Sequence, residues 1–321
     1  MKSEFLESEL ELYVQRLLVH EFYSTGNRYK MLKISPSEER LKGYDAKIVG
    51  LTPFYCQFKT SDFLRQGDLY RRRNAFCKSK KWPTSPFHSF ALRVPNDPSD
   101  KKNPNVWQHN VLHEMWKGNP TAVAYVAPLF HTRIQMDLLE PLSYYACCIL
   151  RDHHFHHSNI SIREVGVNDY HRCRLPFFDG LISIPPHVPV TDLKHSYAFT
   201  SHRDITFHSD PELVEGGKPF GEALEQFVRS SLERDEHVGQ DKVELDGIRS
   251  MLGELGRDSE FLNSFLAFGL FQAGVNTQEI GAEATTSWQK VPWLKRHAAL
   301  SASLQAYFGI STLGLLKVEE Q

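Results

Sequence analysis

The sequence predicts an α/β fold with a helical C-terminal appendage, and three observations predict it. Helical and strand-like patterns alternate over the first 130 residues, short apolar runs follow, and the last third has helical periodicity with almost no strand signal. The 321 residues are enough for about two domains. We therefore expect an α/β domain over residues 1–212, with a β-rich extension after about residue 131, and a helical domain over residues 217–321.

The first predicted helix spans residues 5–23, because apolar residues recur there at a spacing of three to four and a Ser-Thr-Gly-Asn breaker follows. Two β-prone runs come next, at 44–49 and 53–59. Gly50-Leu51-Thr52 separates them, so we expect a hairpin with its turn at these residues. The later elements predicted up to residue 130 are a partial helix within 61–81, a strand over 87–94, a helix over 106–117 and a buried strand over 121–127.

Beyond residue 131, apolar runs at 180–186 and 196–199 predict extra strands. A stretch rich in Pro and Gly between residues 209 and 219 is the expected domain boundary. After it, the segments with helical periodicity are 221–235, 243–255, 258–273 and 287–309.

The composition excludes several classes of protein. Hydrophobic residues make up 41% and charged residues 24%, which excludes a disordered chain or a coiled coil as a description of the whole. The formal charge is 37 − 39 = −2, so any affinity for nucleic acid must come from a local patch. The five cysteines include no CxxC pair, and no signal-peptide pattern or run of 18 apolar residues occurs. We expect a cytoplasmic protein that does not cross a membrane.

The predicted hairpin would bring polar side chains together. A turn at residues 50–52 places Asp45 opposite Gln57, and Lys47 opposite Tyr55, with opposing Cβ atoms about 5 Å apart. Gln57 and Lys59 share a face because strand side chains alternate. The oxygens of Asp45 and Gln57, with the carbonyl of Phe58, could then bind a hard divalent cation beside the Lys59 ammonium. Alternatively, Asp45 is a polar residue near a turn and Lys59 lies on a solvated sheet edge.

These residues resemble the restriction-endonuclease-like PD-(D/E)XK nuclease superfamily, in its Mrr-like variant with a QxK motif. The resemblance lies in Gly43-Tyr44-Asp45 and Tyr55-Cys56-Gln57-Phe58-Lys59, behind a helix that bears glutamates, and it covers about residues 5–130. It implies a mixed sheet flanked by helices, and an endonuclease that hydrolyses phosphodiester bonds of DNA with Mg²⁺ (or Mn²⁺). Asp45 and Gln57 would bind the metal, and Lys59 would orient the water or stabilise the pentavalent phosphate.

The superfamily also uses a carboxylate from the first helix. On a helical wheel with Leu10 at zero, Glu11 lies at about +100°, at the edge of the apolar arc, and Glu21 lies at about +20°, inside it. Glu9 lies outside the arc, at about −100°. We therefore expect Glu11 to support catalysis, with Glu21 as the second candidate and Glu9 facing solvent.

A basic patch follows the motif. Residues 65–81 carry seven cationic side chains against Asp68 alone, a local balance of +7 − 1 = +6. The cationic residues are Arg65, Arg71, Arg72, Arg73, Lys78, Lys80 and Lys81. Such a patch suits a phosphate backbone, whose neutralisation releases counterions; the alternative is a basic surface that covers a sheet edge. Ser61 could also touch phosphate, although we expect a surface serine.

The resemblance implies that such a nuclease serves restriction or phage defence. The alternative function is a catalytically inactive nucleic-acid-binding or scaffold subunit of a defence complex. The chain has no GxxxxGK[ST] phosphate loop, so energy coupling would need a partner ATPase or another defence subunit. The choice between DNA and RNA, and between a monomer and a homo-oligomer, stays open.

A histidine-rich segment offers a rival metal site. His153, His154, His156 and His157 cluster there, and His171 and Cys173 follow. His153 and His157 have the spacing of zinc ligands on a helix. No HExxH motif accompanies them, so a structural metal site or a buried polar cluster is the better interpretation.

Overall fold

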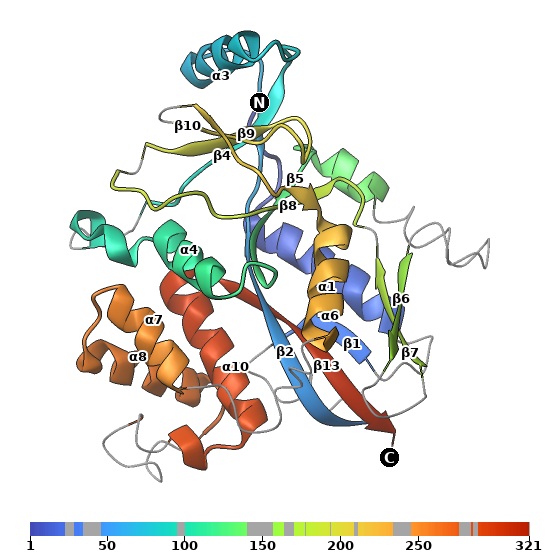
Figure 1. Ribbon diagram of the computed structural model, residues 1–321, viewed down its shortest axis with the longest axis vertical. Helices are drawn as coiled ribbons and strands as arrows, with labels where there is room; N and C mark the ends of the chain where they lie inside the picture. The colour runs from blue at the N-terminus through green and yellow to red at the C-terminus, as the bar shows by residue number, and fades with distance from the viewer. Residues whose placement is uncertain are drawn as a thin grey trace. The chain divides into compact units, whose positions relative to one another are not determined.

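The computed structural model of the chain (Figure 1) describes residues 1–22, 29–34, 46–94, 100–139, 157–163, 170–176, 178–192, 194–208, 211–233, 245–275, 284 and 288–320. The chain divides into two compact units, each built from separate segments. The first unit contains Met1–Thr25, Gln57–Ile160 and Arg174–Phe227; the second contains Gly26–Cys56, Ser161–Cys173 and Val228–Gln321. The predicted α/β class is confirmed, because helices and β-sheets make up the described chain. No helix in these ranges is long and apolar enough to cross a membrane.

Helix α1, Glu7–Phe22, confirms the first predicted helix. Leu10, Val14 and Leu18 are fully buried because residues four apart lie on the same side of a helix. The start of α1 is capped by Glu9, whose carboxylate accepts a hydrogen bond from the backbone N–H of Leu6 (2.8 Å).

The first unit contains a five-stranded sheet in the order β11-β10-β9-β4-β3. Its strands are β3 Asp62–Leu64, β4 Phe87–Ala91, β9 Ser196–Phe199, β10 Thr206–His208 and β11 Glu212–Leu213. The predicted strands at 87–94 and 196–199 are confirmed. Aromatic side chains pack on this sheet; the ring centroids of Phe90 and Tyr197 lie 5.0 Å apart.

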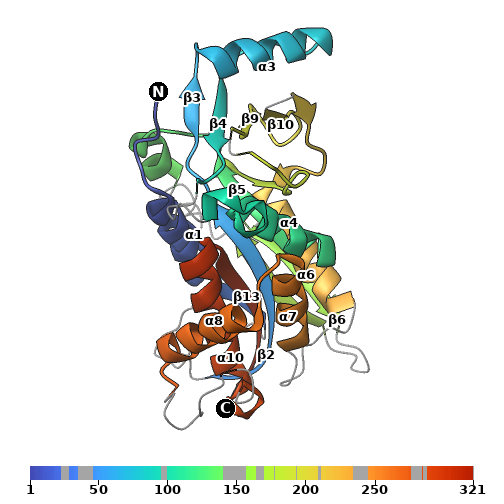
Figure 2. The ribbon, with the colours of Figure 1, turned by 90° about the vertical axis from the view of Figure 1, so that its left-hand side faces the viewer.

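Helix α3, Asp68–Ser79, is the predicted partial helix within 61–81. It follows Gly67, whose φ of 104° lies in the region that favours glycine. Figure 2 shows α3 beyond the ends of β3 and β4. One residue of α3, Arg73, is only 1% exposed. Its guanidinium lies 2.7 Å from Asp204 Oδ2 and donates from Nε to Thr206 Oγ1 (3.2 Å).

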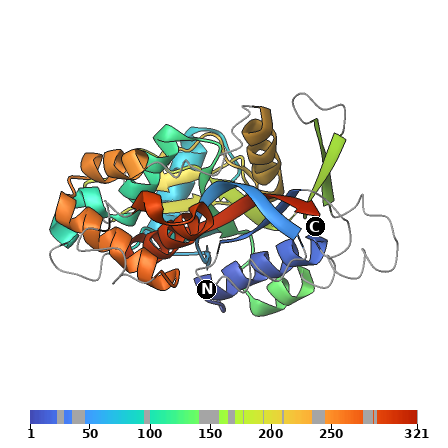
Figure 3. The same ribbon diagram turned by 90° about the horizontal axis from the view of Figure 1, so that it is seen from below.

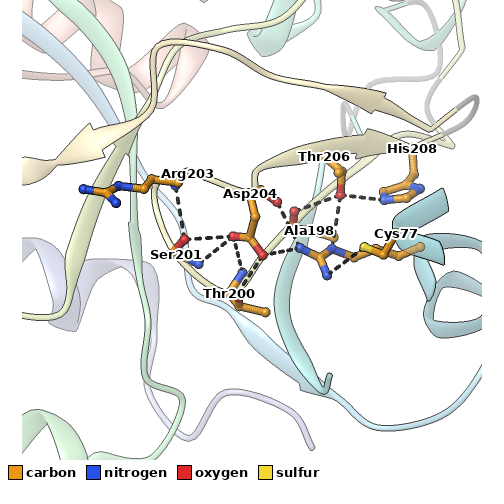
Figure 4. A network of polar contacts seen from close by, with 9 residues as sticks. Cys77, Ala198, Thr200, Ser201, Arg203, Asp204, Thr206 and His208 are labelled. Atoms are coloured by element: carbon orange, nitrogen blue, oxygen red, sulfur yellow. Dashed lines mark hydrogen bonds and ion pairs between the residues drawn. The ribbon is translucent and has the colours of Figure 1, made fainter. Parts of the chain in front are cut away.

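The carboxylate of Asp204 is the centre of a polar network (Figure 4). It accepts hydrogen bonds from the backbone N–H groups and the hydroxyls of Thr200 and Ser201. Partial burial alone would raise the pKa of Asp204, but the hydrogen bonds from Thr200 and the ion pair with Arg73 outweigh it and lower this pKa. Arg73 therefore joins α3 to the turn between β9 and β10.

A six-stranded sheet has the order β1-β13-β2-β5-β8-β12. Its strands are β1 Tyr29–Lys33, β2 Ala46–Phe58, β5 Val123–Pro128, β8 Leu181–Ile184, β12 Lys218–Pro219 and β13 Ser311–Glu320. In the second unit β13 pairs antiparallel with both β1 and β2. In the first unit β8 pairs antiparallel with β5 and β12. The strands predicted at 121–127 and within 180–186 are confirmed as β5 and β8. A two-stranded sheet joins β6, His157–Arg163, to β7, Tyr170–Pro176.

Strand β2 is continuous, so the predicted hairpin is wrong. Gly50, Leu51 and Thr52, expected to form its turn, pair instead with residues 317, 316 and 315 of β13. Leu51 is 2% exposed and packs with Leu32, Ile34 and Leu316, so the strand buries an apolar side chain that a turn would expose.

The loss of the hairpin also removes its predicted cross-strand pairs. Lys47 pairs with Glu319, and Tyr55 pairs with Thr312. Asp45 lies outside the described residues. Its predicted place opposite Gln57 therefore has no hairpin to support it.

The helices predicted after residue 217 are confirmed. They are α6 Phe220–Glu233, α7 Leu245–Glu254, α8 Ser259–Gln272 and α10 Trp293–Ser303; helix α4, Gln108–Gly118, likewise confirms the earlier helix over 106–117. Helices α8 and α10 lie side by side (Figures 2 and 3), and a Cβ atom at Gly269 would come within 2.2 Å of the Ala299 carbonyl oxygen. The expectation of almost no strand in this third needs a correction, because β13 is a ten-residue strand.

The substitution Arg73→Met is expected to lower the free energy of unfolding by about 3 kcal/mol, the low end of the range for breaking a buried ion pair. Asp204 is 25% exposed and keeps its other hydrogen bonds, which limits the loss. Because the folded-state pKa of Asp204 is lowered, the contribution is present above the unfolded aspartate pKa of about 4 and is lost as the pH falls through the folded value. Urea unfolding from about pH 7 to about pH 2 measures both effects.

Arg72→Met is the matched control, because Arg72 is 44% exposed and contacts Asp68 on the surface. It should leave the stability nearly unchanged. A loss for Arg73→Met no larger than that for Arg72→Met would contradict the importance of the buried ion pair.

Candidate functional site

Lys59 follows the last residue of β2, and its side chain is buried. Its backbone N–H donates to the Val126 carbonyl oxygen of β5 (2.9 Å), and the residue is 3% exposed. A buried ammonium needs partners. Its Nζ lies 3.3 Å from Glu7 Oε1 and 3.4 Å from Gln108 Oε1. The alternative interpretation of Lys59 as a residue on a solvated edge is therefore wrong.

Three residues of the first unit supply this arrangement. Glu7 is the first residue of α1, Gln108 is the first residue of α4, and Lys59 leaves the end of β2. Burial lowers the pKa of Lys59, while the carboxylate of Glu7 opposes this effect. The Glu7 side chain is 49% exposed, so the ion pair is open to solvent on the side of α1.

Gln57 and Ser61 flank Lys59 as buried polar residues without partners. Gln57 is 1% exposed, and neither its amide nitrogen nor its amide oxygen has a hydrogen-bond partner in the protein. Ser61 is fully buried, so the expected surface serine is wrong, and its Oγ likewise has no partner. An unsatisfied buried polar group costs about 1–3 kcal/mol. Unsatisfied buried groups two residues before and two residues after a buried ammonium indicate a place where a ligand supplies the missing hydrogen bonds.

The α1 carboxylate that reaches Lys59 is Glu7, which is not among the site residues predicted from the sequence. The same helical wheel places Glu7 at about +60°, inside the apolar arc, so the signal was present. Glu11, the favoured candidate, lies one turn further along the helix and is partly buried. Glu9 faces away from the apolar arc and binds Arg133 Nη2 (2.7 Å). The side chain of Glu21 lies outside the described residues.

The donor set fits a hard divalent cation in type. The unpartnered Gln57 Oε1 and the Glu7 carboxylate are oxygen ligands, the kind that Mg²⁺ prefers, and the Phe58 carbonyl lies between Gln57 and Lys59 in the chain. Among the residues that the structure describes, no group of three or more His, Cys, Asp or Glu side chains could hold a metal. Asp45, the predicted carboxylate ligand, is outside that set.

The rival histidine-rich site lies mostly outside the described chain. His153, His154 and His156 are not among the described residues. His157 lies in β6, and His171 and Cys173 lie in β7, but their side chains are not described. The structure therefore does not test the rival zinc site.

Six of the seven predicted basic residues form an exposed surface on and around α3. They are Arg65, Arg71, Arg72, Lys78, Lys80 and Lys81. Arg73, the seventh, is buried against Asp204 and is withdrawn from this surface. Aromatic rings accompany the cations; the Phe76 and Trp82 ring centroids lie 6.0 Å apart, and the Lys80 ammonium lies 5.8 Å from the Phe76 ring.

Two of the predicted site residues, Gln57 and Lys59, thus lie two residues apart at the end of β2, and Glu7 and Gln108 contact Lys59. Comparisons of the chain with protein-family models, curated proteins and solved structures find no match. Any assignment of function depends on the chemistry of this site and of the basic surface.

The variant Glu7→Gln is expected to lower the pKa of Lys59 further, because it removes the carboxylate that favours the charged ammonium. The shift is measured from the pH dependence of the Lys59 ¹³Cε chemical shift. Glu9→Gln is the control, since Glu9 contacts Leu6 and Arg133. Equal shifts in the two variants would contradict a specific ion pair between Glu7 and Lys59.

Proposed function

We propose that the chain is a metal-dependent endonuclease that hydrolyses phosphodiester bonds of DNA with Mg²⁺ or Mn²⁺. The observation that carries the proposal is the buried Lys59 ammonium, paired with Glu7 at 3.3 Å and preceded by the unpartnered amide of Gln57. These residues carry the QxK part of the resemblance to the PD-(D/E)XK superfamily. The order α1, β2, α4 and β5 around them supports a restriction-endonuclease-like arrangement.

Each residue has a distinct role in this proposal. Lys59 stabilises the negative charge that grows on the phosphoryl oxygens, and it does so strongly because its ammonium is removed from water. Glu7 keeps that ammonium charged and oriented. Gln57 Oε1 and Asp45, with Glu7 or Glu11, would hold the cation. When bound, the cation makes water a stronger nucleophile and polarises the phosphoryl group.

The exposed cations on and around α3 contact the DNA backbone. Phosphate contacts position a duplex without reading its sequence. Arg71 is 78% exposed and Arg72 is 44% exposed, so both reach solvent, although Asp68 partly neutralises them. The buried free thiols of Cys56 and Cys77 suit a reducing cytoplasm.

A second candidate is a catalytically inactive nucleic-acid-binding or scaffold subunit. The observation that favours it is that the basic surface consists of residues other than Gln57 and Lys59, so binding does not require an active site. The two candidates differ in what removal of the Lys59 charge does to a bound duplex.

Purified protein with Mg²⁺ or Mn²⁺ is expected to cut duplex DNA, and EDTA should abolish cutting. Lys59→Met should lower the cleavage rate by about 10²–10³-fold, as for the loss of an electrostatic donor in a catalytic site, while DNA binding stays nearly unchanged. Single-turnover cleavage and a binding titration measure the two effects.

Glu9→Gln is the control and should cut as the parent protein does, because the glutamine amide oxygen can still accept the hydrogen bond from Leu6 N–H that caps α1, and only the exposed ion pair with Arg133 is lost. Unchanged cleavage by Lys59→Met would move the active site elsewhere. Salt-sensitive DNA binding without cleavage under any of these metal conditions would favour the second candidate.

The double variant Arg71→Ala/Arg72→Ala is expected to weaken DNA binding and to reduce the slope of log affinity against log salt by up to about two units, near 0.9 for each phosphate contact. Arg73 is left unchanged because its removal would disturb the fold. Arg133→Ala, which removes an exposed arginine that contacts Glu9, is the control and should leave the slope as it is. An unchanged slope in the double variant would place the DNA path away from α3.

A further inference from the structure

Three side chains with hydrogen-bond donors lie within five residues at the end of β2. Gln57 is 1% exposed, Lys59 is 3% exposed and Ser61 is fully buried. Gln57 and Lys59 project from the same face, because strand side chains alternate and Lys59 still bonds to β5 through its backbone N–H. Two residues span at most about 7 Å of backbone, so the Cα atom of Ser61 lies within about 7 Å of the Cα atom of Lys59.

These groups retain unused donors. The amide nitrogen of Gln57 has two N–H bonds, and neither has a partner. The Ser61 hydroxyl has no partner. The ammonium of Lys59 has three N–H bonds, and its contacts with Glu7 and Gln108 use two of them.

A ligand that satisfies these donors must present several acceptor oxygens and a negative charge. A tetrahedral oxyanion has both properties, whereas an apolar or cationic ligand would leave the donors unsatisfied. We propose that Gln57 Nε2, Lys59 Nζ and Ser61 Oγ together bind one phosphoryl group, and that Ser61 is a direct substrate contact. The inference deepens the proposed nuclease function and rests on it for the identity of the phosphoryl group as part of a nucleic acid.

The amide of Gln57 then has two tasks. Its Oε1 would hold the cation, and its Nε2 would donate to the phosphoryl group. Glutamine has both an acceptor and a donor at its end, whereas an ionised glutamate offers acceptors alone. Compared with a glutamate at the same position, the Gln of the QxK motif therefore removes one negative charge from the metal site and adds a hydrogen bond to the substrate.

The test uses the full chain in EDTA, with inorganic phosphate as the probe and sodium chloride added to keep the ionic strength constant. Calorimetry should detect phosphate binding to the parent protein, and Ser61→Ala should weaken the affinity about tenfold or more, as for the loss of a hydrogen bond to a charged group. Without phosphate, Ser61→Ala should melt at the same temperature as the parent or higher, because it removes an unsatisfied buried hydroxyl.

Ser301→Ala is the matched control. Ser301 is also buried, at 4% exposure, but its hydroxyl donates to the Ile34 carbonyl oxygen (3.1 Å). This variant should melt at a lower temperature and bind phosphate as the parent does. The pair of variants separates loss of a ligand contact from loss of a structural hydrogen bond.

Equal phosphate affinity in the parent and Ser61→Ala, or no phosphate binding by the parent, would overturn the inference. A lower melting temperature for Ser61→Ala without phosphate would also overturn it, since the hydroxyl would then have a partner in the free protein. Because the probe is inorganic phosphate without metal, Ser61-dependent binding by a protein that cuts no DNA would reject the nuclease function and keep the phosphoryl site.

Discussion

The burial of the Lys59 ammonium constrains the first unit more than any other charge at the candidate site. Removal of an ammonium from water costs several kcal/mol, so the fold must supply acceptors. Glu7 and Gln108 do so from the first turns of two helices. The position of Glu7 depends in turn on how α1 begins, and Glu9 holds that end by capping Leu6 and by binding Arg133. The start of α1 therefore has to be ordered for Lys59 to be paired.

A buried cation needs a charged or polar partner, and this requirement also explains why Arg72 and Arg73, neighbours on α3, differ in exposure. Successive residues on a helix point about 100° apart, so Arg72 reaches solvent while Arg73 turns toward the five-stranded sheet. Asp204 pairs with Arg73, and the ring of Phe87 lies 4.7 Å from its guanidinium. A count of charges along the sequence cannot show which of the two arginines is buried and which is exposed. The basic surface is consequently weaker than its sequence suggests.

Local patterns predicted the helices well, because the signal for a helix lies within its own residues. The apolar spacing that predicted α1, α7 and α8 is the spacing that these helices bury. The hairpin failed for the opposite reason. Gly50-Leu51-Thr52 has the composition of a turn, but its partner strand begins at residue 311, and no local pattern records a pairing across more than 250 residues.

The candidate site was predicted in part for the same reason. Gln57 and Lys59 are two residues apart, so strand alternation was enough to place them on one face. Glu7 also lies within the apolar arc of its helix, whereas the predicted candidate, Glu11, lies at the edge of that arc, one turn later. No pattern in the residues around Gln108 predicts a role for it at the site. Its contact with the Lys59 ammonium arises only when the folded chain brings the start of α4 to the end of β2.

The two polar clusters of the first unit differ in how well they are satisfied. Around Asp204, donors and acceptors are matched, as expected of a cluster that joins a helix to a sheet. Around Lys59, Gln57 and Ser61 are buried with unmatched atoms, although apolar residues of similar size would cost less. Buried polar groups without partners are expected mainly at functional sites. The unsatisfied cluster is therefore the one at which we propose that a ligand binds.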